Sequence, residues 1–545
     1  MADRLSDLYQ DLLDGTYDCV DRIVLNAYFR PGHSPGGFRT WWRRLTGSDD
    51  GLDTAHLMRL AGRFSRRVRA YAKANRIPVV VCGVGEHKHE LAEQHLATTS
   101  VTDGVFLIIV GRAQAPVWEV SGKHHLERKR PMPYVNHYSF HILDREWGHI
   151  TIKVSGHPPF PAQCIFNGHE WVACQARQQR IRFAKEGNCF TDISEIAGLA
   201  RIADTLSDAR TIGRLREVCE RWIYSACLCF ALDLDEQCRS GFRYQYSTYQ
   251  LEYSRNLVFT VGGWMDQVFQ ALIDRTRIRM DLRTVKTILG YHRRPRYRRR
   301  RGKEPTWEVT VERPVYDLTI FKLHCGRLTL KIYTKGERVL RIEAMAHNTR
   351  ALGGRRSLSE FPQLVGELKS ILERFVDALA CIDRCFIGGE TLDQLPTPSP
   401  LGQTTVAGID VNKPRTRWVA EAVLALALAP HRFTAADLTA QVHRLGGPAA
   451  SSYTARRAAY DLKKFRGKHL VRRIEGTRRY APEPKGLQTL AALIVLRNHV
   501  IRPLLAAADQ TAPARRPRNQ TAIDRHYAAL RTEMHGLFHE LGLAA

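Results

Sequence analysis

The chain has 545 residues, of which 82 are Lys or Arg and 55 are Asp or Glu, so its formal net charge at pH 7 is +27. Hydrophobic residues make up 44% and charged residues 25%, as in folded globular proteins, and no run reaches the roughly 18 apolar residues that a membrane span needs. The composition therefore argues against a membrane protein and favours anionic partners, nucleic acid before a lipid surface.

The cysteines carry no recognisable framework. Twelve of them are scattered along the chain, without the spacing of a disulfide scaffold or of a structural zinc site. The first fifteen residues are polar and acidic, unlike a signal or transit peptide. We therefore expect reduced thiols and a cytoplasmic protein.

Residues 1–75 are predicted to form a basic helical region, with helices over 18–27 and 54–74. A pair of tryptophans surrounded by arginines stands between these helices. Aromatic rings stack on bases and guanidinium groups bind phosphates, so this segment favours a nucleic-acid contact. The candidate residues are Arg39, Trp41, Trp42, Arg43 and Arg44. For the arginines of the second helix, a solvated helix face is the alternative interpretation.

Residues 76–394 are predicted to be an α+β core. The alternation of 134–143 and 149–155 indicates a hairpin, and the densest group of His, Asp and Asn in the chain surrounds and follows it. Such side chains can hold a divalent cation or position a phosphate. The candidates are His141, Asp144, Asn167 and His169, and the pattern leaves open whether they meet or only stabilise the fold. Glu252, on a later aromatic strand, is an additional candidate carboxylate.

The strongest basic run, YHRRPRYRRRRGK, covers residues 291–303 and contains no acid. A like-charge block of this kind stays loosely structured until it meets an anion, so we predict a nucleic-acid-contacting loop. The alternative is a solvated linker. The candidate contacts are Arg293, Arg294, Arg296, Arg298, Arg299, Arg300 and Arg301.

Three strands in close succession are predicted at 316–324, 328–334 and 339–346, with glycine-containing turns between them. Period-two alternation places Lys331, Tyr333 and Lys335 on one face of the middle strand. In the third strand, Arg341 and Glu343 share a face. One sheet face is therefore expected to carry all five side chains.

The segment DLTIFKLHCGRLTLKIYTKGERVLRIEA resembles the strand pair of trans-type rolling-circle replication initiators. The resemblance implies a central antiparallel, Rep-like sheet flanked by helices and a tyrosine that nicks single-stranded DNA with the help of a divalent metal, Mg²⁺ or Mn²⁺. It makes Tyr333 the nucleophile candidate, Glu343 a metal carboxylate, and Lys331 and Lys335 phosphate contacts. Thr334 stands where the family has an acid.

The histidines and acid of the earlier cluster, His141, Asp144 and His169, are the candidates to complete that metal site. More broadly, the chain resembles bacterial mobile-element proteins, a resemblance that implies no established activity.

Residues 395–414, which begin with a Pro-rich stretch, are predicted to be a linker, and 415–507 a DNA-binding module. Two helices, a turn, a further helix over 454–466 and a β-hairpin follow in the order of a winged helix–turn–helix, which this segment resembles. Its candidate DNA contacts are Arg456, Arg457, Lys463, Lys464, Arg472, Arg473, Arg478 and Arg479. Residues 508–545 are predicted to be a linker and a C-terminal helix.

Two functions of different class remain open. In one, the central sheet is a metal-dependent endonuclease or strand transferase and the winged helix selects the site on DNA. In the other, nothing is cut, and the protein is a DNA- or RNA-binding factor, a regulator or the protein part of a ribonucleoprotein. The sequence leaves open the choice of DNA or RNA, the target sequence, a guide RNA and the oligomeric state.

Overall fold

The computed structural model divides the chain into two compact units, which we call the α+β unit and the C-terminal unit. The α+β unit is Tyr9–Asp266 with Thr310–Leu372, and the C-terminal unit is Met1–Leu8, Gln267–Val309 and Glu373–Ala545. The residues that the structure describes are 4–48, 51–83, 86–121, 125–224, 228–279, 307–315, 318–325, 327–353, 357–383, 393–427, 432–495, 497, 525–526, 528–530 and 532–533.

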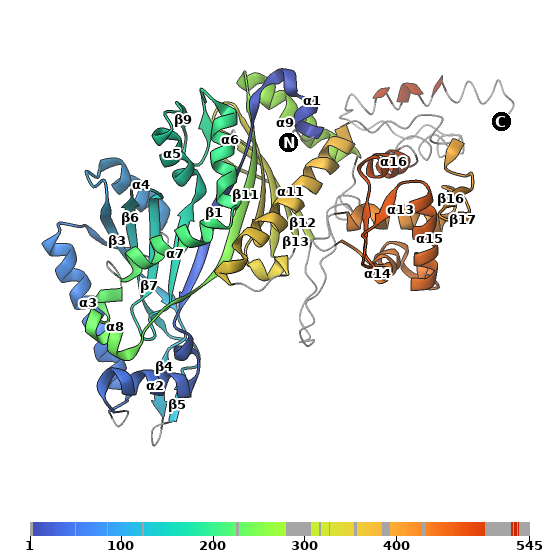
Figure 1. Cartoon of the computed structure of the whole chain (residues 1–545). Coiled ribbons are helices and arrows are strands. Elements are labelled where there is room, and N and C mark those ends of the chain that lie inside the picture. The colour runs from blue at the N-terminus through green and yellow to red at the C-terminus, as the bar shows by residue number, and fades with distance from the viewer. Residues whose placement is uncertain are drawn as a thin grey trace. The chain divides into compact units, whose positions relative to one another are not determined.

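One sheet of eleven strands dominates the fold, in the order β12-β13-β14-β15-β11-β1-β8-β7-β6-β3-β2 (Figure 1). Its strands are β1 (Leu13–Tyr28), β2 (Val79–Val81), β3 (Gly104–Gln114), β6 (Tyr134–Asp144), β7 (Gly148–Ser155), β8 (Ala162–Asn167), β11 (Gln245–Phe259), β12 (Trp307–Val315), β13 (Leu318–Cys325), β14 (Leu328–Lys335) and β15 (Val339–Ala346). All the pairings that are described are antiparallel except β2 with β3. The α+β class and the antiparallel sheet are as predicted.

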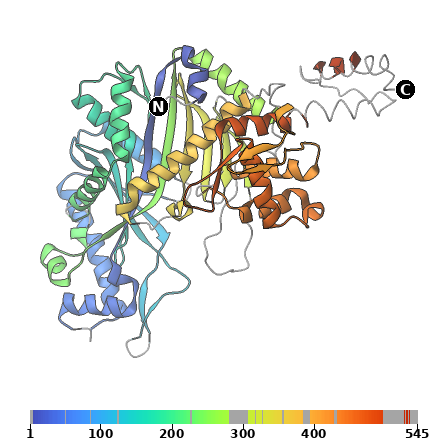
Figure 2. The ribbon, with the colours of Figure 1, turned by 45° about the vertical axis from the view of Figure 1, so that its right-hand side comes forward.

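Helices α6, α7 and α11 cross the front of this sheet in Figure 1, and Figure 2 shows the same layering after a turn of the molecule. The described α-helices up to residue 383 are α1 (Arg4–Leu8), α2 (Pro35–Thr46), α3 (Thr54–Ala74), α4 (Lys88–Thr98), α5 (Gly168–Gln178), α6 (Ile196–Asp204), α7 (Arg210–Trp222), α8 (Leu234–Ser240), α9 (Gly262–Arg279) and α11 (Phe361–Asp383). The apolar stripe of α11, with Leu364, Leu368 and Leu372, is buried. This burial of a helical stripe supplies the hydrophobic stabilisation of the layer.

The helix predicted over 18–27 is wrong, because this stretch lies inside the sixteen-residue strand β1. Val20, Ile23 and Val24 are buried, and β1 pairs with β11 along one edge and with β8 along the other. A strand buried on both faces reads as a nearly continuous apolar run, which periodicity alone does not distinguish from a helix. Residues 9–75 therefore belong to the α+β unit and not to a separate region, since β1 lies at the centre of the sheet, whereas the helix predicted over 54–74 is present as α3.

The sheet contains a repeated topology. In the first half, β1 is followed by helix α3 and then by β3, β6, β7 and β8, the last of which returns to pair with β1. In the second half, β11 is followed by α9 and then by β12, β13, β14 and β15, which returns to pair with β11. Because β1 and β11 are antiparallel to each other, an approximate twofold axis relates these half-sheets.

Register fixes how the two half-sheets correspond. Strands β7 and β14 have eight residues each, so they can be compared position by position. The sixth residue of β7, Lys153, pairs with Gln163 of β8, and the sixth residue of β14, Tyr333, pairs with Arg341 of β15. Gln163 then pairs with Asn26 of β1, and Arg341 with Asn256 of β11. Lys153 therefore corresponds to Tyr333, Gln163 to Arg341, and Asn26 to Asn256.

The C-terminal unit contains a helical module with a small hairpin. Its elements are β16 (Ser399–Leu401), β17 (Thr404–Val406), α13 (Pro414–Leu426), α14 (Ala435–Gly446), α15 (Ala455–Gly467), β18 (Val471–Arg473), β19 (Tyr480–Pro482) and α16 (Pro484–Val495). Val423, Leu438 and Leu462 are fully buried where the helices pack. A capping box of Thr434 and Asp437 begins α14.

The predicted linker is structured. Within 395–414, β16 and β17 form a hairpin, and both Leu395 and Ile409 are buried. Lys468 Nζ donates to the Thr397 hydroxyl at 3.0 Å, which ties this segment to the end of α15. Among the described residues, no helix is both long and apolar enough to cross a membrane.

Candidate functional site

The three predicted strands bring their polar side chains together as expected. The β14–β15 register pairs Lys331 with Glu343 and Tyr333 with Arg341. The Tyr333 hydroxyl donates to Glu343 Oε2 at 3.0 Å, and Lys331 Nζ lies 3.5 Å from the same oxygen. Glu343 is buried, whereas Tyr333 and Lys331 are half-buried, so the carboxylate lies beneath two side chains that reach the surface.

A second carboxylate lies on the next strand. Glu343 pairs with Ser254 of β11, so Glu252 is its diagonal neighbour on the same face. Burial, and after it the charge of Glu343, raises the pKa of Glu252 to about 8. Burial and Glu343 also raise the pKa of the Tyr333 hydroxyl above its ordinary value. Two carboxylates that resist ionising together attract a cation or a shared proton.

Below this group, Arg341 is fully buried and joins several strands and loops. Its Nε donates to Asn256 Oδ1 at 2.7 Å, and its Nη1 lies 3.9 Å from Asp21 Oδ2. Its Nη2 lies 3.3 Å from His169 Nε2 and donates to the carbonyl oxygen of Asn188. A buried charge needs several such partners, because a buried charge left without one lowers the stability of the fold by about 3–5 kcal/mol.

His169 completes the buried group. Its Nδ1 is 2.8 Å from Asp21 Oδ1, although neither carboxylate oxygen of Asp21 is aligned for a hydrogen bond. Asn167 accepts from the backbone N–H of His169 where α5 begins. Gly168 permits this placement: a Cβ there would lie 1.7 Å from the carbonyl oxygen of Val20. Only glycine lets the helix start so close to β1.

The charge states of this group follow from its surroundings. Burial acts to raise the pKa of Asp21, but Arg341 and His169 outweigh it and hold the pKa below its ordinary value. Burial lowers the pKa of His169 to about 4, against the opposing attraction of Asp21. At neutral pH the group therefore holds an Asp21 carboxylate, an Arg341 guanidinium and a neutral imidazole.

Within the described part of the chain, one group has three potential metal ligands close together: Cys19, Asp21 and His169. Sulfur, oxygen and nitrogen donors in one place suit Zn²⁺ better than Mg²⁺ or Mn²⁺, which prefer oxygen. The neighbouring guanidinium already neutralises the carboxylate, and burial raises the pKa of the Cys19 thiol well above its ordinary value. The oxygen ligands that fit Mg²⁺ or Mn²⁺ are instead those of Glu343 and Glu252.

The other predicted metal ligands lie in different surroundings. His141 is buried and its Nδ1 lies 3.1 Å from His149 Nε2. Asp144 is the last residue of β6, and its carboxylate accepts from Trp147 N at 3.0 Å, Trp222 Nε1 at 2.7 Å and Arg221 Nη1 at 3.1 Å. Asp144 therefore holds the turn against α7. His169 lies in the Arg341 group.

The tryptophan pair is not available for base stacking, so this part of the predicted nucleic-acid patch is wrong. Trp41 and Trp42 are 1% and 3% exposed. Trp41 lies edge-on to Phe38 and Phe242, with ring centroids 5.0 and 5.9 Å apart. These rings form the core between α2 and the sheet. Of the arginines, Arg43 and Arg44 are exposed and Arg39 is half-buried.

The remaining nucleic-acid candidates divide in two. The basic run 291–303 lies outside the described residues. In the C-terminal unit, the predicted arginines and lysines lie on α15 and on the β18–β19 hairpin. Arg456, Arg457, Lys463, Arg472, Arg473 and Arg478 are exposed, whereas Lys464 and Arg479 are half-buried.

Sequence reasoning missed Cys19, Asp21, Asn188 and Asn256 as members of the polar group. One signal was present: in Tyr17-Asp18-Cys19-Val20-Asp21, the first, third and fifth residues share a face once the stretch is a strand. Assigning that stretch to a helix hid the alternation. The loop that brings Asn188 to Arg341 has no comparable signal.

Comparison with protein-family models, with curated proteins and with solved structures gave no match.

Proposed function

We propose that this protein binds DNA and cuts one of its phosphodiester bonds at the Tyr333 site. The observation that carries the proposal is the Tyr333 hydroxyl donating to Glu343 at 3.0 Å beside Lys331. A nucleophile that donates a hydrogen bond to a base, with a cation nearby, is the arrangement that acyl and phosphoryl transfer require. The formal net charge of +27 supports a nucleic acid as the substrate.

In this proposal, Tyr333 Oη attacks phosphorus while Glu343 takes the phenolic proton. The Oη–P bond forms, the bond from phosphorus to one ester oxygen of the backbone breaks, and that oxygen leaves as a hydroxyl after taking a proton from water. Lys331 offsets negative charge on the non-bridging oxygens. Glu343 and Glu252 would hold Mg²⁺ or Mn²⁺, whose charge supplies Lewis-acid stabilisation of the phosphate.

The C-terminal unit supplies duplex binding in the same proposal. Helices α13, α14 and α15 followed by the β18–β19 hairpin have the order of a winged helix–turn–helix, in which the last helix enters the major groove. Exposed cations on α15 and the hairpin would contact phosphates and base edges.

A second candidate is a binding factor that cuts nothing. It is favoured by the fact that Glu343 is already engaged by both Tyr333 and Lys331, and that the Tyr333 pKa is raised, as in a self-satisfied structural network. Under this alternative, the same face would contact DNA or RNA only.

A nicking assay separates the two. Purified full-length chain is incubated with supercoiled and with labelled single-stranded DNA in Mg²⁺, in Mn²⁺ and in chelator. We expect metal-dependent nicking and a covalent protein–DNA adduct that Tyr333→Phe and Glu343→Gln abolish. Tyr249→Phe, at another half-buried tyrosine of the sheet, is the matched control and should keep activity. Nicking that survives Tyr333→Phe would exclude Tyr333 as the nucleophile, whereas the absence of nicking with every metal would leave the binding factor.

A further inference from the structure

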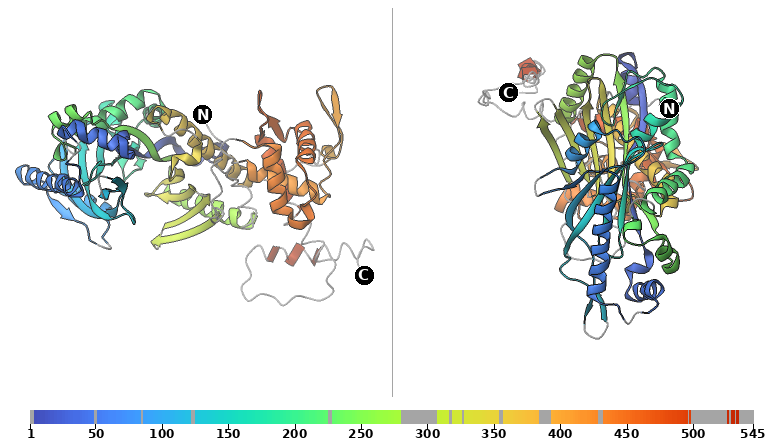
Figure 3. Two further views of the ribbon diagram at one scale, coloured as in Figure 1. Left: turned by 90° about the horizontal axis from the view of Figure 1, so that it is seen from below. Right: turned by 90° about the vertical axis from the view of Figure 1, so that its left-hand side faces the viewer.

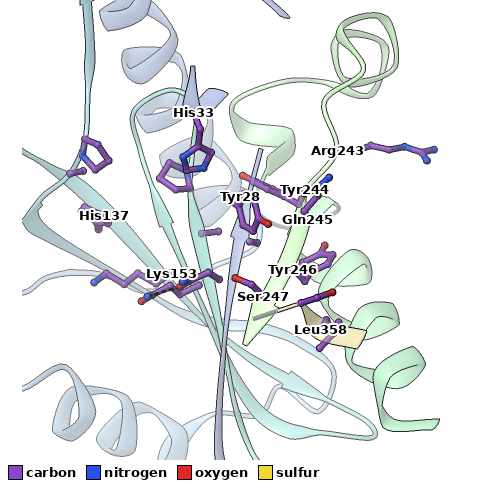
Figure 4. A pocket seen from close by; sticks show the side chains of 18 of the residues that line it. Tyr28, His33, His137, Lys153, Arg243, Tyr244, Gln245, Tyr246, Ser247 and Leu358 are labelled. Carbon is purple, nitrogen blue, oxygen red and sulfur yellow. Dashed lines mark hydrogen bonds between the residues drawn. The ribbon is translucent and has the colours of Figure 1, made fainter. Parts of the chain in front are cut away.

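The α+β unit contains a pocket of about 1190 Å³ at the far end of the β1–β11 pair from the Tyr333 site (Figure 4). Strand alternation places polar side chains of four neighbouring strands along it: Asn26 and Tyr28 of β1, Gln163 of β8, Lys153 of β7 and Gln245 of β11. Figure 4 shows Lys153 and His137 on one side of the pocket and Arg243 on the other.

The pocket is cationic. Lys153 is half-buried, and Arg216, Arg243 and Arg350 are exposed at its rim. Within the described residues, none of these four cations forms an ion pair, and Glu220 is the single carboxylate among the lining residues. Burial, and then Lys88, lowers the pKa of Lys153, a sign that its charge lacks a partner. An anion entering the pocket would supply that partner.

The internal repeat gives an independent reason to regard this pocket as a site. At the corresponding positions, Gln163 Nε2 donates to Asn26 Oδ1 at 3.0 Å and Arg341 Nε donates to Asn256 Oδ1 at 2.7 Å. The same cross-strand bond thus forms the floor of both sites. In the second half-sheet, however, His169, Asp21 and the Asn188 loop fill the space above that floor. In the first half-sheet the space is open.

We propose that this pocket binds a segment of single-stranded nucleic acid. The free cations suit backbone phosphates, the amides of Asn26, Gln163 and Gln245 suit base edges, and the half-buried ring of Tyr28 suits stacking. Carboxylates corresponding to Glu343 are lacking, since Ile165 occupies that position, so the pocket binds the strand and does not cut it. The proposal rests on the proposed function in its choice of nucleic acid as ligand.

The two sites lie on one face and at opposite ends of β1. Asn26 and Tyr17, which pair with Ser247 and Asn256, are nine residues apart, or roughly 30 Å at about 3.4 Å per residue. A strand held at the pocket would therefore extend along the β1–β11 pair towards Tyr333. This placement assigns the pocket to the part of the strand that lies away from the cut.

Fluorescence anisotropy of the full-length chain with labelled (dT)15 tests the proposal, with excess unlabelled duplex to occupy the C-terminal unit. The test variant is Lys153→Gln/Arg243→Gln/Arg350→Gln. The control is Arg145→Gln/Arg201→Gln/Arg210→Gln, which removes the same charge from exposed ion pairs of the same unit. We expect Kd to rise at least tenfold in the test variant and less than twofold in the control. The slope of log affinity against log salt should fall by about 2, at about 0.7 per phosphate contact.

Photocrosslinking of a 4-thiothymidine-substituted oligonucleotide gives a direct readout. Adducts on Tyr28 or on the 243–247 segment support the proposal. Equal loss of affinity in test and control variants, adducts confined to the C-terminal unit, or displacement of the oligonucleotide by dTMP at equal concentration would overturn it.

The proposed binding in the pocket and the proposed cleavage at Tyr333 can be disproved independently of each other. Tyr333→Phe should leave the (dT)15 affinity within twofold of the wild-type value, because Tyr333 lies outside the pocket. A chain that binds through the pocket without nicking disproves only the proposed cleavage, whereas a chain that nicks while the pocket variant binds normally disproves only the pocket.

Discussion

The first and second half-sheets share a topology but differ in what stands at matched positions. In the second, Tyr333 and Glu343 form a hydrogen bond above the buried Arg341 group. In the first, Lys153 and Ile165 occupy the corresponding positions, and Lys153 lines an open pocket. The floor is retained in both: an Asn on β1 or β11 whose Oδ1 accepts a hydrogen bond from a side chain of the neighbouring strand.

This difference teaches that the backbone repeat sets where a site can form, while a few side chains decide its chemistry. The second half-sheet concentrates carboxylates, which attract metals and protons. The first presents cations without partners, which attract phosphates.

Replacing Arg341 with methionine should lower the free energy of unfolding by about 4 kcal/mol, because the buried Asp21 carboxylate would lose its compensating charge. The matched change in the other half-sheet, Gln163→Met, breaks a neutral and partly exposed hydrogen bond and should cost about 1 kcal/mol. Urea unfolding followed by tryptophan fluorescence measures both. Similar losses of unfolding free energy at Arg341 and Gln163 would contradict the contrast between the charged group in the second half-sheet and the neutral hydrogen bond in the first.

The first half-sheet should be sensitive to acid through His141. Burial, and then His149, lowers the pKa of His141 to about 3, so the folded chain keeps this imidazole neutral while the unfolded chain protonates it near pH 6.5. Stability from this group is complete above pH 6.5 and is lost as pH falls towards 3. Between pH 6.5 and 5 the loss is about 1.6 kcal/mol.

In His141→Asn, the difference in unfolding free energy between pH 6.5 and 5 should shrink by that amount. His89→Asn removes an exposed histidine of α4 and should leave the difference unchanged. A wild-type chain equally stable at both pH values would refute the assignment.

Metal affinity of the second half-sheet should rise with pH. The pKa of Glu252 is about 8, raised by burial and by Glu343, so this carboxyl is mostly protonated at pH 7 and ionised at pH 9. We expect Mn²⁺ affinity, measured by isothermal titration calorimetry, to increase about fivefold from pH 7 to 8, or about 1 kcal/mol. Glu252→Gln should abolish the increase, and a pH-independent affinity in the wild type would argue against Glu252 as a ligand.

The smallest effect is expected outside the sheet. Arg472→Gln/Arg473→Gln in the hairpin should weaken binding to duplex DNA about fivefold and lower the salt slope by about 1.8, at about 0.9 per phosphate contact. Lys413→Gln/Lys485→Gln removes two exposed charges of the same unit and serves as the control. If both pairs behave alike in an electrophoretic mobility assay, the hairpin makes no specific contact, and duplex binding must be sought elsewhere.

The β14–β15 hairpin was predictable almost to the residue, since strict alternation and a glycine turn specify both register and face. The predicted face of Lys331, Tyr333, Arg341 and Glu343 follows directly from that register. Helices α14 and α15 were also predictable, because a threonine cap precedes each apolar stripe.

Other parts depend on contacts that are distant in sequence. Strand β1 was mistaken for a helix because both its faces are buried. Trp41 and Trp42 lie beside arginines in sequence but are both buried, and Trp41 packs against Phe242, some two hundred positions away. Nor does any local pattern show that Asp21, His169 and Arg341 meet, since each comes from a different strand or helix.

The β1–β11 pairing has a consequence for how the α+β unit could be assembled. The longest strands of the sheet, β1 with sixteen residues and β11 with fifteen, pair with each other and so join the two half-sheets. In sequence, the segment that leads from the first half-sheet to the second contains helices α6, α7 and α8. Cleavage in that connection, for example at the exposed Gly241, would yield two fragments, each presenting one long unpaired edge. Such edges aggregate alone but are complementary to each other. Coexpressed fragments should therefore reconstitute the unit.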